Sequence, residues 1–283
     1  MPVRRRRFES ATSYDELALS QGEAVKASRR RIEELLYRLG LSKVTSPLWE
    51  RLRGGRALQQ SRLMQKFYSS LLPANALVFD VGANVGTMTA IFAALGAKVV
   101  AVEPNPDCAK HIERATSRDA VQVLQAAVGE QDGFAELKIS DRKDKMSSLS
   151  PAWREAVSKE NQDYAGMWNR TLSVPMVTLD SLIRRFGSPS YIKVDVEGYE
   201  DQVLSGLSSC PPLLSFEFNR VFLEPAIRAL DNPIFANAEF NYTLVDPVKF
   251  ELPNWVDRLQ LKQLLAGANS ASGVGDIFAR HSN

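Results

Sequence analysis

The sequence predicts an α/β protein whose mostly parallel β-sheet carries helices on both faces. From Leu77 onward, short runs rich in β-branched residues alternate with helical patterns, as they do in right-handed βαβ units. A glycine-containing turn at residues 82–86 joins the first of these runs to the first helical pattern. Glu103 closes the second run, where nucleotide-binding sheets carry an acidic ribose ligand.

The composition is that of a globular protein with room for a full-sized core. The chain has 283 residues, of which 45% are hydrophobic and 24% charged. Its apolar stretches are interrupted well before the roughly 20 residues that a membrane span needs. The basic start, MPVRRRRFES, is not followed by an apolar segment, so it is not typical of a secretory signal. We therefore expect no membrane span and a cytoplasmic location.

Residues 1–72 are predicted to form a helical N-terminal extension or cap. Ile32, Leu35, Leu36 and Leu39 recur at helical spacing within residues 14–40, and a second helical stretch runs from about Leu58 to Leu72, before Pro73. Residues 1–66 hold 15 Lys and Arg against 7 Asp and Glu. Such a basic segment can bind nucleic acid, a membrane surface or an acidic partner, but a solvated helical face is the favoured explanation.

Residues 73–283 are predicted to form the α/β domain. Its expected strands share short apolar runs, and they are LVFDV, KVVAVE, VQVLQ, FAELKI, YIKVDV, LLSFEF, NYTLVD and DIFAR. Its first two helices are expected in TMTAIFAALG and PDCAKHIERA. A polar stretch at about 140–173 interrupts the alternation yet carries Trp153, Tyr164 and Trp168. We interpret it as an insertion, either a lid or binding segment or a surface helix whose aromatic rings pack down.

The turn at 82–86 has the features of a ligand site at the carboxyl end of a strand. Gly82 and Gly86 allow the backbone to approach a ligand, and the following helix N-terminus suits a carboxylate or phosphate. A dinucleotide fingerprint would place glycines where Asn84 and Thr87 stand, which argues against NAD or FAD. Glu103 lies 21 residues after Gly82, where its carboxylate can accept bonds from both ribose hydroxyls. An adenosyl ligand without a pyrophosphate is therefore favoured.

Several segments in order resemble the FkbM family of S-adenosylmethionine-dependent methyltransferases. They are FDVGANVGTMT, AVEPNP, AAVGE, SSL, VTLDSL, YIKVDVEGYEDQVLSG and LLSFEF, which span about residues 77–219, and GDIFAR, which fits the last strand of the family. The resemblance implies a class I methyltransferase fold, Rossmann-like, with a mostly parallel seven-stranded sheet. It does not cover residues 1–70 or the insertion at 150–170.

The resemblance also implies S-adenosyl-L-methionine as cofactor and a small-molecule or saccharide hydroxyl as methyl acceptor. By position, Asp80 would lie near the methionyl amino group and the backbone of Gly82, Ala83, Asn84 and Gly86 near the carboxylate. Glu103 would hold the ribose, while Asn105, Ala127 and Val128 would line the adenine side. Asp195 and Glu197 would face the transferred methyl group.

The residues themselves favour Asp195 and Glu197 as the catalytic pair. Asp195 follows a hydrophobic strand, and strand periodicity would put Glu197 on the same side if the strand continued. Two neighbouring carboxylates separate in pKa, which leaves one a better base. The alternative is that Glu197 caps the next helix and Asp195 only anchors the cofactor. His111 is expected to be an exposed helix residue, and Lys193 only a strand-edge residue.

Glu217, at the end of LLSFEF, adds a third carboxylate. Asp195, Glu197 and Glu217 could chelate a hard cation such as Mg²⁺, but no spacing demands it, so no metal is predicted. The hydroxyls of SSL at 147–149 could touch cofactor or acceptor, or start a helix before Pro151.

Two other functions stay open at this point. Methylation of RNA or protein would make use of the basic N-terminal segment, but Asp195-Val196-Glu197-Gly198 stands where base methyltransferases carry an Asn-Pro-Pro-Tyr-like tetrapeptide. A methyltransferase fold that only binds partners is the non-enzyme alternative. The expected nucleotide-site residues Asp80, Gly82 and Glu103 argue against that reading.

Overall fold

The computed structural model describes residues 58–140, 147–160, 164, 166–244, 248–267 and 273–281. The predicted helices at 14–40, like the other residues before 58, lie outside this part of the chain. A helix over residues 58–69 is present where one was predicted to begin. Residues 60–283 form one compact unit.

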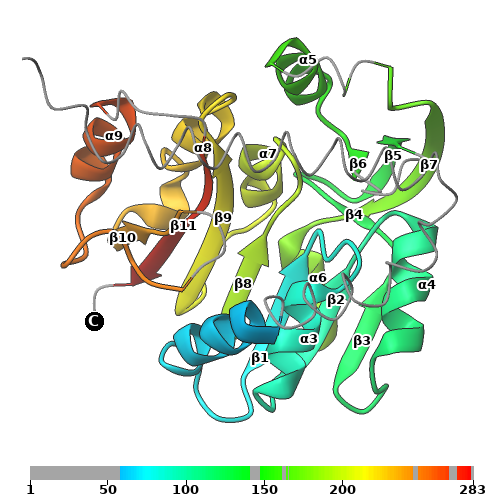
Figure 1. Cartoon of the computed structure of the whole chain (residues 1–283), viewed down its shortest axis with the longest axis horizontal. Helices are drawn as coiled ribbons and strands as arrows, with labels where there is room; N and C mark the ends of the chain where they lie inside the picture. The colour runs from blue at the N-terminus through cyan, green and yellow to red at the C-terminus, as the bar shows by residue number, and fades with distance from the viewer. Residues whose placement is uncertain are drawn as a thin grey trace, which may run out of the picture. The chain divides into compact units, whose positions relative to one another are not determined.

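A seven-stranded sheet forms the centre of this unit (Figure 1). Its strand order is β10-β11-β9-β8-β1-β2-β3, and the bounds are β1 Leu77–Val81, β2 Lys98–Val102, β3 Val121–Leu124, β8 Tyr191–Val194, β9 Leu213–Asn219, β10 Ala238–Tyr242 and β11 Val274–His281. The pairs from β9 to β3 are parallel, while β11 runs antiparallel to both of its neighbours. The predicted class I methyltransferase fold is thereby confirmed.

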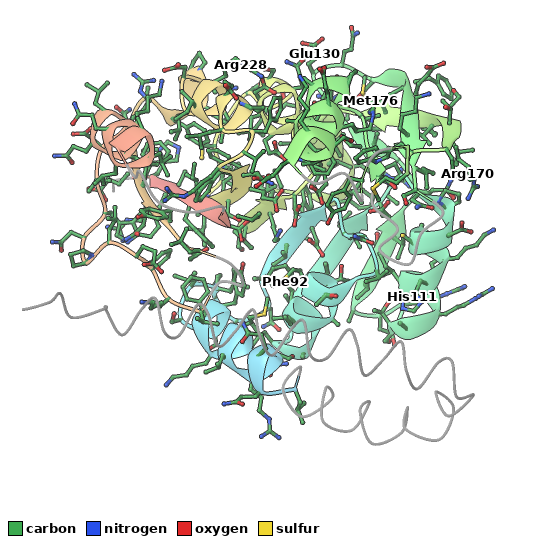
Figure 2. The ribbon with its side chains drawn as sticks, turned by 45° about the horizontal axis from the view of Figure 1, so that its top comes forward. Phe92, His111, Glu130, Arg170, Met176 and Arg228 are labelled. Atoms are coloured by element: carbon green, nitrogen blue, oxygen red, sulfur yellow. The ribbon has the colours of Figure 1, made fainter. Side chains whose placement is uncertain are left out.

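Helices cover both faces of the sheet because successive strand residues point to opposite sides. Val78 of β1 packs in one cluster with the helix at 58–69 and with α3 Thr87–Ala94 and α4 Pro106–Ala115. Phe79 packs on the other side, in a cluster with α6 Leu179–Phe186, α7 Glu200–Ser205, α8 Glu224–Ala229 and α9 Arg258–Gly267. A 3₁₀ turn at Pro233–Phe235 precedes β10. Phe92 of α3, labelled in Figure 2, is fully buried in the same cluster as Val78.

Capping residues explain where two of these helices begin. Pro106 occupies the first turn of α4, and the Asn105 side chain accepts a bond from the Asp107 N–H (3.0 Å). Thr178 caps α6 in the same way, by accepting from the Ser181 N–H (3.0 Å).

A second sheet of four strands accounts for the interruption predicted near residue 140. Its order is β4-β7-β5-β6, with β4 Ala127–Val128, β5 Gly133–Ile139, β6 Ser147–Ser148 and β7 Arg170–Val177, and α5 Pro151–Glu160 follows β6. The expectation that FAELKI continues the main sheet is wrong, because it forms β5 and pairs antiparallel with β7. Figure 1 shows this sheet and α5 on the side where β1, β2 and β8 end.

Two further expectations are corrected. The last-but-one strand begins at Ala238 and ends at Tyr242, earlier than NYTLVD suggested. Lys193 is not a strand-edge residue, since β8 is the middle strand of the sheet and Lys193 is only 4% exposed. Cys108 and Cys210 are buried. Within the described residues, none of the helices has both the length and the apolar character that a membrane crossing requires.

Candidate functional site

A pocket of about 770 Å³, open to solvent, lies at the carboxyl ends of β1, β2 and β8. The pocket brings together seven of the predicted site residues, namely Gly82, Asn84, Glu103, Ala127, Val128, Asp195 and Glu197. Parallel strands that end at one edge of a sheet place these residues side by side although more than a hundred positions separate them in sequence.

The turn after β1 needs glycine for a reason that the sequence did not reveal. Gly82 has φ +81°, and a Cβ added there would lie 1.8 Å from the Asp195 carbonyl oxygen. Its N–H donates to the Val102 carbonyl (2.9 Å). The missing side chain thus lets the end of β8 approach the turn, which brings Asp195 to the pocket.

Glu103 is 4% exposed, and its carboxylate is fixed by two backbone donors. The Asn84 N–H donates to Oε2 (2.7 Å) and the Asn105 N–H to Oε1 (2.8 Å). Burial raises the pKa of Glu103 to about 7, although both hydrogen bonds act in the opposite direction. Each oxygen retains a second lone pair, so the carboxylate can still accept two hydroxyl groups from a ligand in the pocket.

Three carboxylates meet on the opposite wall of the same pocket. Oxygen atoms of Asp195, Glu197 and Glu217 lie within 4.8 Å of one another. Burial, and then the neighbouring Asp195 charge, raises the pKa of both Glu197 and Glu217 well above the usual range. The Lys193 ammonium lies 2.7 Å from Asp195 Oδ2 and supplies the compensating positive charge. The raised pKa values favour the protonated forms of Glu197 and Glu217, which can donate hydrogen bonds to a ligand. The Asp195 carboxylate beside Lys193 is then the candidate proton acceptor of the cluster.

The same three oxygens could hold a hard cation such as Mg²⁺, since carboxylates are its preferred ligands. They offer one oxygen each, whereas a Mg²⁺ ion requires six ligands and usually retains several waters.

Glu197 reaches the cluster through a turn and not through strand periodicity. The strand β8 ends at Val194, and Glu197 has φ +57°, in the left-handed region. The Ser148 hydroxyl donates to the Glu197 carbonyl (2.9 Å). The Glu200 carboxylate accepts from the N–H groups of Val196 (3.3 Å) and Gly198 (3.1 Å). These bonds hold the turn in a conformation that a non-glycine residue adopts only at a cost.

Four predicted cofactor residues do not line the pocket, and their roles in binding stay predictions. The Asp80 carboxylate accepts a bond from Thr89 Oγ1 (2.5 Å) behind the turn, and Ala83 is buried in the core. Gly86 has φ +82°, and a Cβ there would meet Ile112 Cγ1 at 2.9 Å. Asn105 is 1% exposed and caps α4. Each of these residues shapes the pocket from behind.

The sequence analysis did not assign Leu137 to the site and left the role of residues 147–149 open. Leu137 of β5 lines the pocket, but FAELKI was assigned to the wrong sheet. Ser147, Ser148 and Leu149 also line it, and Ser147 Oγ accepts a bond from Asn105 Nδ2 (3.3 Å). The SSL segment therefore belongs to the pocket wall, while Ser150 starts α5 by accepting from the Trp153 N–H (3.1 Å).

His111 lies on the exposed side of α4, as Figure 2 shows, and not in the pocket. The expectation that it is an exposed helix residue is confirmed.

Comparison with known proteins finds methyltransferases. The model described as "Methyltransferase FkbM domain" matches residues 80–240, which is more than half of the chain. Hexuronic acid methyltransferase AglP of Haloferax volcanii is 25% identical over 142 residues, 50% of this chain and 53% of that protein. The chain thus spans about half the length of this curated relative.

Solved methyltransferase structures share a lower sequence identity with this chain. Precorrin-6y C5,15-methyltransferase from Geobacter metallireducens is 12% identical, with a TM-score of 0.40 over 76% of this chain and 85% of that chain. A SAM-dependent O-methyltransferase from Thermotoga maritima is 13% identical, with a TM-score of 0.38 over 77% of this chain and 64% of that chain. Because these scores lie below 0.5, the assignment rests on the strand order and on the match over residues 80–240. The chain belongs to the FkbM methyltransferase family.

Proposed function

We propose that the protein transfers a methyl group from S-adenosyl-L-methionine to a hydroxyl group of a small molecule or saccharide. One observation carries the proposal. A single pocket combines Glu103, a fixed acceptor for ribose hydroxyls, with the carboxylates Asp195, Glu197 and Glu217 on another wall. Cofactor binding and proton removal thereby have separate residues within one cavity.

The residues present fit this cofactor. Glu103 would hold the ribose with the lone pairs left after its two backbone bonds. Ala127, Val128 and Leu137 provide an apolar wall for the adenine ring. The N-terminus of α3, directly after the 82–86 turn, offers free N–H groups to the methionyl carboxylate.

Bound S-adenosylmethionine would supply an electrophilic methyl group to the acceptor oxygen, with its sulfur as the leaving group. The protein's own task is to align the acceptor, and orientation of this kind supplies roughly 7–11 kcal/mol of a barrier. Asp195, which pairs with Lys193, would take the hydroxyl proton onto a carboxylate oxygen, worth about 10²–10⁴-fold in rate, while Glu197, whose pKa is raised, would donate a hydrogen bond to the acceptor. Lys193 keeps Asp195 oriented through their 2.7 Å ion pair.

The relative's printed name supports the acceptor class. Hexuronic acid methyltransferase AglP acts by that name on a sugar acid, and the match covers half of each chain. Methylation of RNA or protein would depend on the basic segment, which lies outside the described residues.

Calorimetric titration tests the cofactor assignment. The wild type should bind S-adenosylmethionine and not NAD, and Glu103→Ala should weaken binding at least about tenfold, because two charge-assisted hydrogen bonds are lost. The matched control is Glu113→Ala, an exposed glutamate on α4. If the wild type binds neither ligand, the proposed enzyme activity fails.

The proposed catalytic carboxylates need a separate test. Asp195→Asn and Glu197→Gln should retain cofactor affinity yet lose turnover, measured as formation of S-adenosylhomocysteine with an acceptor. Unchanged rates in both variants would place the base elsewhere.

A further inference from the structure

The short strand β6 is bonded to both walls of the pocket. It consists of Ser147 and Ser148, which both line the pocket, and it leads into α5 (Figure 1). The Ser147 hydroxyl accepts from Asn105 Nδ2 (3.3 Å), and the Asn105 N–H in turn donates to Glu103 Oε1 (2.8 Å). The Ser148 hydroxyl donates to the Glu197 carbonyl (2.9 Å). Because neighbouring side chains of a strand point to opposite sides, two adjacent serines can reach the Glu103 wall and the carboxylate wall together.

Glu197 depends on such contacts because its backbone adopts an unfavourable conformation. Its φ of +57° lies in the left-handed region, which a non-glycine residue keeps only where surrounding contacts impose it. Within the 195–198 turn, the Glu200 carboxylate accepts from the N–H groups of Val196 and Gly198. Ser148 acts on the same turn from the second sheet, since β6 pairs with β5. Loss of its hydroxyl would remove the bond that fixes the Glu197 carbonyl.

Ser148 is itself held firmly enough to act on the turn. The residue is 1% exposed, and its Oγ accepts from the Ser150 N–H (2.9 Å). This bond uses an oxygen lone pair, which leaves the hydroxyl hydrogen for the Glu197 carbonyl. A Cβ added to Gly198 would lie 2.5 Å from Trp153 Cβ, so α5 packs directly on the same turn. The segment from β6 into α5 therefore contacts the turn by a hydrogen bond and by packing.

We propose that Ser148 is a positioning residue, which holds the turn that carries Glu197 and transmits to it the binding of a nucleoside at Glu103. This inference rests on the proposed function and adds a residue to its machinery. A nucleoside beside Glu103 would restrain β6, because Ser147 is bonded to Asn105, whose N–H fixes the Glu103 carboxylate. With β6 restrained, the Ser148 hydroxyl stays on the Glu197 carbonyl. The 195–198 turn then becomes more rigid although the nucleoside need not touch it.

Adenosine separates this transmission from direct contact with the turn. It carries the adenine and ribose of the cofactor but neither the methionyl chain nor the methyl group proposed to face the catalytic carboxylates. Hydrogen exchange of the amides in residues 195–199, measured by mass spectrometry on the full chain, should slow at least about fivefold when adenosine saturates the wild type. Calorimetry on the same preparation establishes the adenosine concentration that saturates the site.

Serine variants assign the response to the two bonds. Ser148→Ala should exchange roughly fivefold faster without ligand, because one hydrogen bond is lost, and should respond little to adenosine. Ser148→Thr keeps the hydroxyl and should restore the response, while Ser147→Ala, which breaks the bond to Asn105, should weaken it. Ser205→Ala is the matched control, because exposed Ser205 donates to the Asp201 carbonyl (2.9 Å) within α7, and it should respond as the wild type does. Binding of S-adenosylmethionine by each variant shows that it folds.

The outcomes distinguish the two proposals. Failure of the wild type to bind S-adenosylmethionine defeats the proposed function itself. If the cofactor binds, the positioning role of Ser148 is overturned by any of three results: adenosine does not bind, adenosine binds but leaves exchange in residues 195–199 unchanged, or Ser148→Ala and Ser147→Ala respond to adenosine as fully as the wild type.

Discussion

Glu103 is an acid whose protonation state decides whether it can hold a ribose. Its pKa of about 7 means that the carboxyl group is largely protonated below that pH and ionised above it. Because only the ionised form accepts two hydroxyl bonds without donating, affinity for S-adenosylmethionine should rise as the pH increases through about 7. Calorimetry between about pH 5.5 and pH 8.5 measures this rise.

Glu103→Gln is the control for that pH dependence. Its amide group would point an N–H₂ donor at the backbone N–H of either Asn84 or Asn105, so binding should be weak at every pH. A variant that kept the wild-type pH profile would assign the titration to another carboxyl group, such as Glu200, whose pKa burial also raises to about 7.

Gly82 allows a prediction about stability with an unusually close control. Gly82→Ala combines a left-handed φ with a Cβ placed 1.8 Å from the Asp195 carbonyl oxygen. Gly96 has the same φ of +81°, but nothing lies within 4 Å of an added Cβ. Chemical denaturation should show a loss of about 1–2 kcal/mol for Gly96→Ala and more than about 3 kcal/mol for Gly82→Ala. Equal losses would mean that the close approach of β8 does not constrain the turn.

At the scale of elements, Asn105 tests whether a predicted cofactor residue acts instead as a helix cap. Asn105→Ala removes the bond to the Asp107 N–H and the longer one to Ser147 Oγ but leaves the backbone bond to Glu103 intact. We expect a loss of about 1 kcal/mol in the free energy of unfolding and a change below about threefold in cofactor affinity.

Thr178→Ala removes the equivalent cap of α6 and serves as the control. If Asn105→Ala weakens S-adenosylmethionine binding tenfold while Thr178→Ala does not, Asn105 contacts the cofactor after all.

The second sheet is the element that sequence reasoning missed, for a physical reason. FAELKI has the alternation of a strand, but alternation does not reveal which strand is its partner. Leu172, Val174 and Met176 also alternate with more polar residues, but no strand was predicted there. Pro175 stands in β7, between β4 and β5. Leu137 was therefore absent from the predicted site, whereas local patterns predicted most strands of the main sheet and the two helices that follow its first strands.

Glu197 illustrates a similar limit. Its place next to Asp195 was anticipated, but the reason given, continued strand periodicity, does not apply to a residue with φ +57°. The bonds that hold this turn come from Ser148 and Glu200, one distant in sequence and one assigned no role. Local patterns predict the residues at a strand end better than the contacts that orient them.

For the molecule as a whole, the buried carboxyl groups determine how stability depends on pH. Burial raises the pKa of Glu103 and Glu200 to about 7, and those of Glu197 and Glu217 also lie well above the usual range. The folded protein thus binds more protons than the unfolded chain above about pH 4.5, so its free energy of unfolding should fall as the pH rises toward and through 7.

Differential scanning calorimetry measures this effect, with Glu200→Gln as the comparison. The glutamine oxygen can still accept the N–H bonds from Val196 and Gly198, but the group no longer titrates. We expect a flatter pH dependence in the variant. If the stability of the variant fell with pH as steeply as that of the wild type, Glu200 would not contribute to the pH dependence of folding.

The placement of β11 has a consequence for how the chain reaches its native state. β11, residues 274–281, is the last strand in sequence, yet it lies between β9 and β10 and pairs with both. During synthesis, β10 therefore emerges from the ribosome before the strand that links it to the sheet exists. The edge of β9 stays open until then, and such an edge can pair with other chains. Closure of the sheet is accordingly a late step in folding, and it is the stage at which aggregation competes with folding.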